Sequence, residues 1–182
     1  MRLARLALCV TFAVTTPVIF AQAAPQPGSA ASWKPFQEFN FLLGSWSGTA
    51  ESGGRIGGRV ARWTIEMGGN FLVHHGSTIF PAQGGSPEES IEEVGYYAYD
   101  RDRRKYVAHY FYSTGLFGTY DVEFSADGST RVLSSQLMNY EAGARTRLTI
   151  TKKSDTELSF QLDIAPSGKD FVSYVSSKLA KK

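Results

Sequence analysis

The stretch ELSFQLDI, residues 157–164, decides the fold class of this chain. Its apolar residues alternate with polar ones without interruption, so that Leu158, Phe160, Leu162 and Ile164 share one face. Successive side chains of a β-strand point to opposite faces of a sheet. The pattern therefore predicts a strand with one buried face and one solvated face.

The same alternation recurs over most of the chain, and turn residues such as Gly68-Gly69-Asn70 and Ala126-Asp127-Gly128 interrupt it. Besides a first strand around Trp46, it predicts strands over residues 60–67, 71–80, 91–99, 105–113, 119–125, 130–140, 145–152, 157–164 and 170–179. No long amphipathic helix is predicted. Residues 33–40, with Pro35 near their start, predict one short helical turn.

About ten strands joined by short links indicate an antiparallel sheet, and a sheet of that size usually curls. Closure removes the exposed edges, and links of hairpin length favour an up-and-down barrel over a sandwich with longer crossings. The sequence thus predicts an all-β fold, a single antiparallel up-and-down β-barrel of about ten strands with a short N-terminal helical turn.

The first 23 residues have the pattern of a cleaved secretory signal peptide. Arg2 and Arg5 precede a mostly apolar run, and Ala21-Gln22-Ala23 ends it. We therefore expect a signal peptide over residues 1–23, a flexible Pro/Ser/Gly-rich leader over 24–32, a barrel domain over 33–182, and a periplasmic or secreted protein. After cleavage no membrane span is expected, and Cys9 is lost, so disulfides and cysteine metal sites are excluded.

Charge excludes one class of partner. Loss of Arg2 and Arg5 reduces the 19 basic residues to the number of acidic ones, 17. A neutral chain lacks the positive charge typical of nucleic-acid binders, and no nucleic-acid partner is expected.

The first strand carries the stretch FLLGSWSGTA, residues 41–50. A Gly-x-Trp on a first strand after a short helical turn resembles the calycin superfamily of lipocalins and fatty-acid-binding proteins. Together with residues 67–73 (MGGNFLV), 95–100 (GYYAYD) and 105–107 (KYV), it resembles more closely the DUF1579 family of uncharacterised bacterial proteins. This resemblance implies a ligand-sized β-barrel and no particular activity.

Four residues receive structural roles from this comparison: Gly44, Trp46, Gly48 and Lys178. The two glycines are expected to let the first strand bend as the barrel closes, while Trp46 plugs the closed end. Lipocalins often pack an arginine of the last strand over this Trp, and here the last strand offers Lys178 instead. The motif also resembles nitrobindin-like haem barrels, but no histidine follows His109 to supply their iron ligand.

Three histidines are candidates for chemistry. His74 and His75 must point to opposite faces of their strand, and the sequence leaves open which of them faces inward. An inward His75 could meet His109 in a cavity as an acid/base pair. Zinc would need further ligands such as Asp121, Glu66 or Glu123, and no short-spaced ligand motif supports a metal site.

Aromatic residues concentrate in the central strands, where tyrosines could give an apolar wall with hydroxyl groups. The candidate ligand-binding residues are Trp63, Phe71, His75, Tyr97, Tyr99, His109, Tyr110, Phe111 and Tyr120. The leading hypothesis is an exported barrel that binds a small, mostly apolar molecule in an aromatic-lined interior.

Two other functions stay open. One is a barrel enzyme, an isomerase or cyclase, that transfers protons through an inward His and Tyr. The other is an envelope interaction protein that uses an exposed apolar patch and has no cavity. The sequence favours a binder over an enzyme, predicts no cofactor and no metal, assigns no catalytic residue, and leaves the oligomeric state undetermined.

Overall fold

A computed structural model describes residues 35–136 and 140–182 of the 182-residue chain. Ten strands form its sheet: β1 (Gly44–Ser52), β2 (Arg55–Glu66), β3 (Phe71–Phe80), β4 (Glu89–Asp100), β5 (Lys105–Tyr112), β6 (Phe117–Phe124), β7 (Thr130–Gln136), β8 (Arg145–Lys152), β9 (Glu157–Ala165) and β10 (Val172–Lys181). Two short 3₁₀ turns accompany them, η1 (Gln37–Leu42) and η2 (Met67–Gly69). The signal peptide and leader predicted over residues 1–32 lie outside the described residues.

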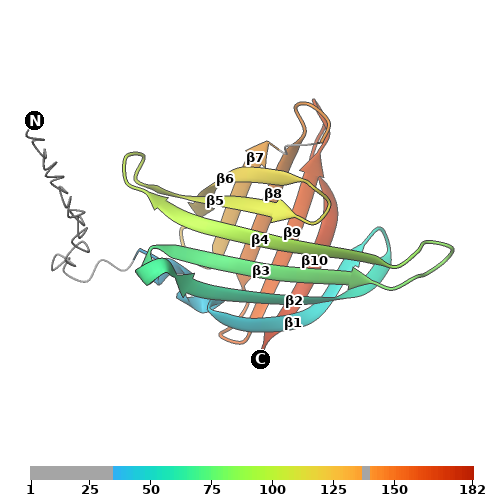
Figure 1. Ribbon diagram of the computed structural model, residues 1–182, viewed down its shortest axis with the longest axis horizontal. Helices are drawn as coiled ribbons and strands as arrows, with labels where there is room; N and C mark the ends of the chain where they lie inside the picture. The colour runs from blue at the N-terminus through green and yellow to red at the C-terminus, as the bar shows by residue number, and fades with distance from the viewer. Residues whose placement is uncertain (1–34, 137–139) are drawn as a thin grey trace, which may run out of the picture. The chain divides into compact units, whose positions relative to one another are not determined.

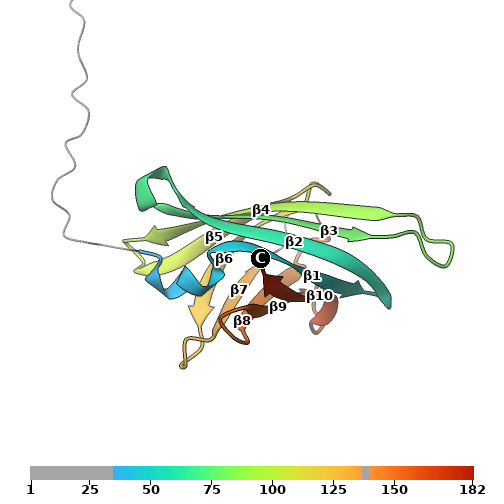
Figure 2. The ribbon, with the colours of Figure 1, turned by 90° about the horizontal axis from the view of Figure 1, so that it is seen from below.

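The strands close into one antiparallel barrel in which each strand pairs with its neighbours in sequence, and β10 pairs with β1. Figures 1 and 2 show β2–β5 as one wall of the barrel and β7–β10 as the wall opposite. The predicted up-and-down barrel with a short N-terminal helical turn is therefore confirmed.

Most strand boundaries follow the sequence pattern closely, but β2 begins at Arg55 and not at Val60 as predicted. β3 and β8 have the predicted bounds, and the positive φ of Met67 ends β2 at Glu66. β10 begins and ends two residues later than the predicted strand, at Val172 and Lys181. The helical turn is displaced toward β1, because η1 begins at Gln37 and ends at Leu42.

One end of the barrel is closed by η1, drawn in blue beside the turns that join β2 to β3 and β4 to β5 (Figure 1). Phe36, Phe39 and Leu42 of this turn are buried in the main core cluster together with Trp46. The indole Nε1 of Trp46 donates a hydrogen bond to the carbonyl oxygen of Leu42, at 2.7 Å. Trp46 thus lies against the turn that plugs the barrel, as predicted.

The seam between β1 and β10 depends on glycine. A Cβ built at Gly48 would overlap the carbonyl oxygen of Lys178 on β10. Gly44, at the start of β1, has φ +112°, which side chains rarely allow. Gly48 therefore permits a close approach of β1 to β10, and Gly44 permits a backbone conformation that a larger residue rarely adopts.

The lysine over Trp46 is Lys181, not Lys178. The two residues Trp46 and Lys181 are paired in register, and the Lys181 Nζ lies 5.3 Å from the ring centroid. Lys178 pairs with Thr49 and is exposed. The assignment differs because β10 continues two residues beyond the predicted strand end.

No helix among the described residues is long and apolar enough to span a membrane.

Candidate functional site

Five strands contribute to a buried polar cluster inside the barrel. On β2 the inward residues are Arg59, Ala61 and Trp63, and His74 and Thr78 face them from β3. Glu93 on β4, Tyr112 on β5 and Thr146 on β8 complete the cluster. Because alternate residues of each strand face inward, these side chains meet although they are distant in sequence.

Arg59 and Glu93 form an ion pair at the centre of this cluster. The Arg59 Nη2 donates to Glu93 Oε1, and the Arg59 Nη1 donates to Thr78 Oγ1 at 2.7 Å. The guanidinium also stacks on the Phe160 ring, 3.9 Å from its centroid. The two charged side chains are only 3% and 5% exposed. Desolvation of two charges costs several kcal/mol per ion, so their presence in the interior calls for a reason other than stability.

Three glycines make room for the large polar side chains on the inner wall. A Cβ at Gly76 would lie 2.8 Å from Glu93 Cγ, and one at Gly95 would lie 2.6 Å from the Tyr110 ring. A Cβ at Gly118 would lie 2.9 Å from the Tyr120 ring. Each distance is too short for real carbon atoms, so the three glycines are needed for this arrangement.

Tyrosines fill the interior between this cluster and the closed end. The Tyr97 and Tyr110 hydroxyls are hydrogen-bonded at 2.6 Å, and the Tyr110 and Tyr120 rings are in edge contact. Burial raises the pKa values of both Tyr97 and Tyr110 above their usual 10.0. The phenols are therefore protonated at neutral pH, and one of the two hydroxyls donates the hydrogen bond that the other accepts.

His74 is the inward histidine. Its ring stacks on Trp63, with centroids 4.3 Å apart, and its Nε2 lies 3.7 Å from Glu93 Oε1. That separation is too long for a hydrogen bond, and neither ring nitrogen has a partner among the described residues. Burial, together with the nearby charge of Arg59, lowers the pKa of His74 well below its usual 6.5. The imidazole is therefore neutral at physiological pH.

A small cavity lies beside the ion pair, away from the end that η1 closes. Its volume is about 40 Å³. Arg59, Thr78, Glu93, Tyr112 and Thr146 form its polar side. The apolar side consists of Ile91, Leu116, Phe160, Leu162, Ile164 and Val175, and Thr114 and Tyr174 complete the lining. The turn between β5 and β6 supplies Thr114 and Leu116, so this hairpin borders the cavity. We call this space the mouth cavity.

The nine residues predicted as ligand-binding are divided between the inside and the outside of the barrel. Trp63, Tyr97, Tyr110 and Tyr120 are buried and pack in the main core cluster, and Tyr99 is packed against it. His75, His109 and Phe111 are exposed, and Phe71 is half-buried. None of the nine lines the mouth cavity. Contact of any of them with a ligand stays a prediction.

The expectation that His75 could meet His109 inside the barrel is wrong. β3 turns Leu72 and His74 inward, which sends His75 to the outer face. On β5 the inward residues are Tyr106, Ala108 and Tyr110, so His109 is also outside, where its Nδ1 lies 3.1 Å from Thr119 Oγ1. Apolar residues occur on both faces of these strands, and for that reason the pattern did not orient the histidines.

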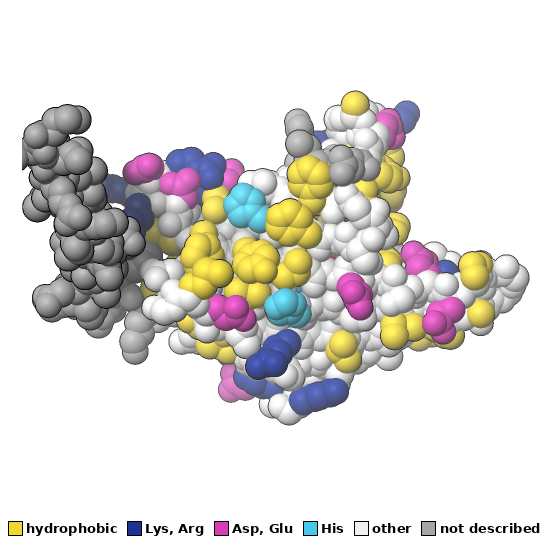
Figure 3. Space-filling model, in the orientation of Figure 1, with side chains coloured by type: hydrophobic (Ala, Val, Ile, Leu, Met, Phe, Trp, Pro, Cys, Tyr) yellow, Lys and Arg dark blue, Asp and Glu magenta, His cyan; other side chains and the backbone are white. Residues whose placement is uncertain are grey.

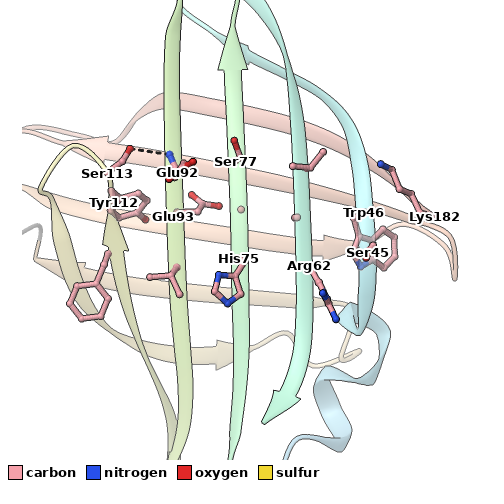
Figure 4. A pocket seen from close by; sticks show the side chains of 15 residues that line it. Ser45, Trp46, Arg62, His75, Ser77, Glu92, Glu93, Tyr112, Ser113 and Lys182 are labelled. Carbon is pink, nitrogen blue, oxygen red and sulfur yellow. Dashed lines mark hydrogen bonds between the residues drawn. The ribbon is translucent and has the colours of Figure 1, made fainter.

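A broad groove of about 800 Å³ crosses the outer face of β1–β5. Its apolar part includes Val60 and Phe111, which are 49% and 47% exposed, and the Phe111 ring stacks on Phe117. Figure 3 shows apolar side chains gathered between the two exposed histidines of this face. Arg62 and His75 from neighbouring strands lie along it (Figure 4).

Sequence reasoning missed Arg59 and Glu93. A signal was present, because Arg59 falls in the same alternating series as Ala61 and Trp63, and a charge in an inward series suggests a buried site. Glu93 stands two residues before Gly95 in the series that also contains Tyr97. Within residues 35–136 and 140–182, no three His, Cys, Asp or Glu residues are grouped closely enough to hold a metal ion.

Comparison with known proteins supports the fold. No family model and no curated protein matches the sequence. The crystal structure of Rv2717c from M. tuberculosis is similar, with a TM-score of 0.59 and 17% identity over 81% of this chain and 96% of that chain. A redesigned beta barrel, b11L5F_LGL, matches with a TM-score of 0.39 and 12% identity over 78% of this chain and 92% of that one. The likeness to Rv2717c is one of fold.

Proposed function

We propose that this protein binds a small, mostly apolar molecule in the mouth cavity. The observation that carries the proposal is the buried Arg59–Glu93 pair beside a cavity whose other walls are apolar. Ligand sites combine an apolar lining with a few convergent polar groups in this way. In other proteins, replacement of a buried ion pair by well-packed apolar residues is often neutral or stabilising, so stability alone gives little reason for this pair.

The size of the cavity limits the ligand. About 10–15 Å³ of cavity volume holds one water molecule. The mouth cavity of about 40 Å³ therefore has room for about three or four waters, or for a molecule of about four non-hydrogen atoms. Tyr97, Tyr110 and Tyr120 are packed in the core cluster and do not line the cavity, so they leave no further room for the ligand.

NMR titration with 2-propanol tests this function. Saturable shifts are expected for methyl groups of the cavity lining, such as those of Ile91 and Ile164, and not for Ile150 in the packed core. Val175→Phe should fill the cavity and abolish binding, whereas Val60→Phe on the outer face should leave binding unchanged. Absence of saturable binding to the original protein would reject the function.

A second candidate function, interaction with a partner through the outer face, is favoured by the exposure of Phe111 and Val60 in the outer groove. Exposed apolar patches of this kind mark interaction surfaces. If a second copy of the chain is the partner, sedimentation equilibrium should detect a dimer that Phe111→Ser weakens. A monomer at all concentrations would exclude self-association.

The acid/base alternative has less support. His75 and His109 face outward, and the inward His74 does not line the mouth cavity. A general base must reach the proton that it removes. The arrangement therefore favours a binding protein.

We also propose that the chain is exported and belongs to the DUF1579-like group of calycin barrels. The N-terminal pattern and the Gly44–Trp46 motif support these proposals. N-terminal sequencing of the mature protein from an envelope fraction tests export, with Ala24 expected as the first residue. A mature protein that keeps residues 1–23 would contradict it.

A further inference from the structure

We propose that the mouth cavity selects neutral ligands whose polar group both donates and accepts hydrogen bonds, such as a primary amide or an alcohol, and rejects carboxylates and alkylammonium ions. This inference rests on the proposed binding function and names the chemical class of its ligand.

The first argument is charge. The cavity contains one cation, Arg59, and one anion, Glu93, and they neutralise each other. The remaining polar groups of the lining are hydroxyls of Thr78, Thr114, Tyr112, Thr146 and Tyr174. A charged ligand would therefore add an uncompensated charge to a site with little solvent, which is unfavourable.

The groups behind the cavity do not alter this balance. His74 lies behind Glu93 and is neutral, and the Tyr112 phenol is protonated because burial raises its pKa well above 10.0. Neither group can supply the charge that would be needed to hold a carboxylate or an ammonium group. The site stays neutral over the physiological pH range.

The second argument is hydrogen bonding. Two of the three guanidinium nitrogens of Arg59 are occupied, by Thr78 and by Glu93, whereas its buried Nε has no partner among the described residues. The Tyr112 hydroxyl lies 3.5 Å from that of Tyr120, longer than a strong hydrogen bond. Donors from Arg59 and Tyr112 are thus available to a ligand oxygen.

An acceptor is available beside these donors. Glu93 and Tyr112 are paired in register, so their side chains project to the same face, and Figure 4 shows them side by side. The Glu93 carboxylate has two oxygens, of which Oε1 bonds Arg59. A carboxylate only accepts hydrogen bonds, so the ligand group near it must donate one. An amide or a hydroxyl group satisfies both sides of the site, whereas an ether or a hydrocarbon does not.

Three probes that each have four non-hydrogen atoms and differ in charge test the selectivity: acetamide, acetate and propylammonium. Isothermal titration calorimetry at neutral pH should show that acetamide binds the unmodified protein at least tenfold more tightly than either ion. This comparison needs no variant, and equal affinity for acetamide and acetate would overturn the inference.

Variants then reverse the preference. Glu93→Gln keeps the shape and leaves Arg59 as an unpaired cation, so acetate should become the tightest ligand by about tenfold. Arg59→Gln leaves Glu93 unpaired, so propylammonium should bind best. Glu92→Gln, on the outer face of the same strand, should keep the original order. Circular dichroism checks that each variant folds, and retention of the acetamide preference in a folded Glu93→Gln variant would overturn the inference.

Failure of the selectivity and failure of the binding function give different results. If 2-propanol binds the cavity and the three probes show no preference, the ligand class is wrong and the binding function stands. If neither 2-propanol nor any of the three probes binds, both are wrong.

Discussion

Glu93 occupies the space in which Gly76 lacks a side chain. The two residues are paired in register on β4 and β3, and a Cβ at Gly76 would lie 2.8 Å from Glu93 Cγ. The glycine thereby places the carboxylate against the Arg59 guanidinium. A single small residue on one strand thus permits the buried ion pair formed by its two neighbours.

Gly76→Ala should displace the Glu93 carboxylate and weaken its bond to Arg59. Overpacking of a filled interior usually costs about 1–3 kcal/mol, and we expect a loss of that size in the free energy of unfolding. Urea denaturation measures it. Gly58→Ala on β2 is the matched control, because nothing lies within 4 Å of a Cβ there, and it should be nearly neutral.

Tyr110→Phe should destabilise the barrel by about 1–3 kcal/mol, because it leaves the buried Tyr97 hydroxyl without the partner that lies at 2.6 Å. Removal of both hydroxyls in Tyr97→Phe/Tyr110→Phe should cost less than the sum of the two single changes. A double-mutant cycle in urea measures the difference. Additive effects would show that the two hydroxyls do not interact.

Stability should fall as the pH decreases below 6.5. His74 has a lowered pKa in the folded protein, whereas in the unfolded chain it titrates near 6.5. The unfolded state therefore binds a proton first, and the free energy of unfolding falls by up to about 1.4 kcal/mol per pH unit until the folded pKa is reached. Urea denaturation between pH 5 and pH 8 measures this slope.

His74→Phe should flatten that pH dependence, since phenylalanine can stack on Trp63 and carries no titrating nitrogen. His75→Gln is the control, because His75 is exposed on the opposite face of β3, and it should keep the slope. If the free energy of unfolding of His74→Phe keeps the same dependence on pH, another titrating group causes that dependence.

Trp46→Phe should destabilise the closed end by about 1–3 kcal/mol, because it removes the hydrogen bond to the Leu42 carbonyl and part of the buried ring. Lys181→Gln should cost about 0.5–1 kcal/mol through the loss of the cation over the Trp46 ring. Lys178→Gln should have no effect. If Lys178→Gln lowered the stability more than Lys181→Gln, the cation over the Trp46 ring would be Lys178.

The alternation of apolar and polar residues was sufficient to predict the barrel, because each strand buries one face and the links are short. The stretch from Leu158 to Ile164 and the strand from Phe71 to Phe80 illustrate this. Trp46 was placed on the first strand by its position between two glycines after an apolar stretch. These features depend on local sequence, so sequence alone was informative.

The site could not be predicted in the same way, because it depends on register between strands. Arg59 and Glu93 are 34 positions apart, and only the barrel brings them together. Leu72 shares a face of β3 with His74, and Val73 shares the other face with His75, so both faces carry an apolar residue. The choice between the two histidines depends on which face of β3 packs on Trp63. The sequence identified Tyr97, Tyr110 and Tyr120 as candidate ligand-binding residues, but only packing shows that they fill the interior instead of lining the cavity.

The most direct measurement is a crystal structure of the protein soaked with acetamide. Difference density is expected in the mouth cavity, with the amide within hydrogen-bond distance of Glu93 and Arg59 and the methyl group against Phe160 and Leu162. A mouth cavity that contains only water at saturating acetamide, or density confined to the outer groove beside Phe111, would contradict binding in the barrel interior.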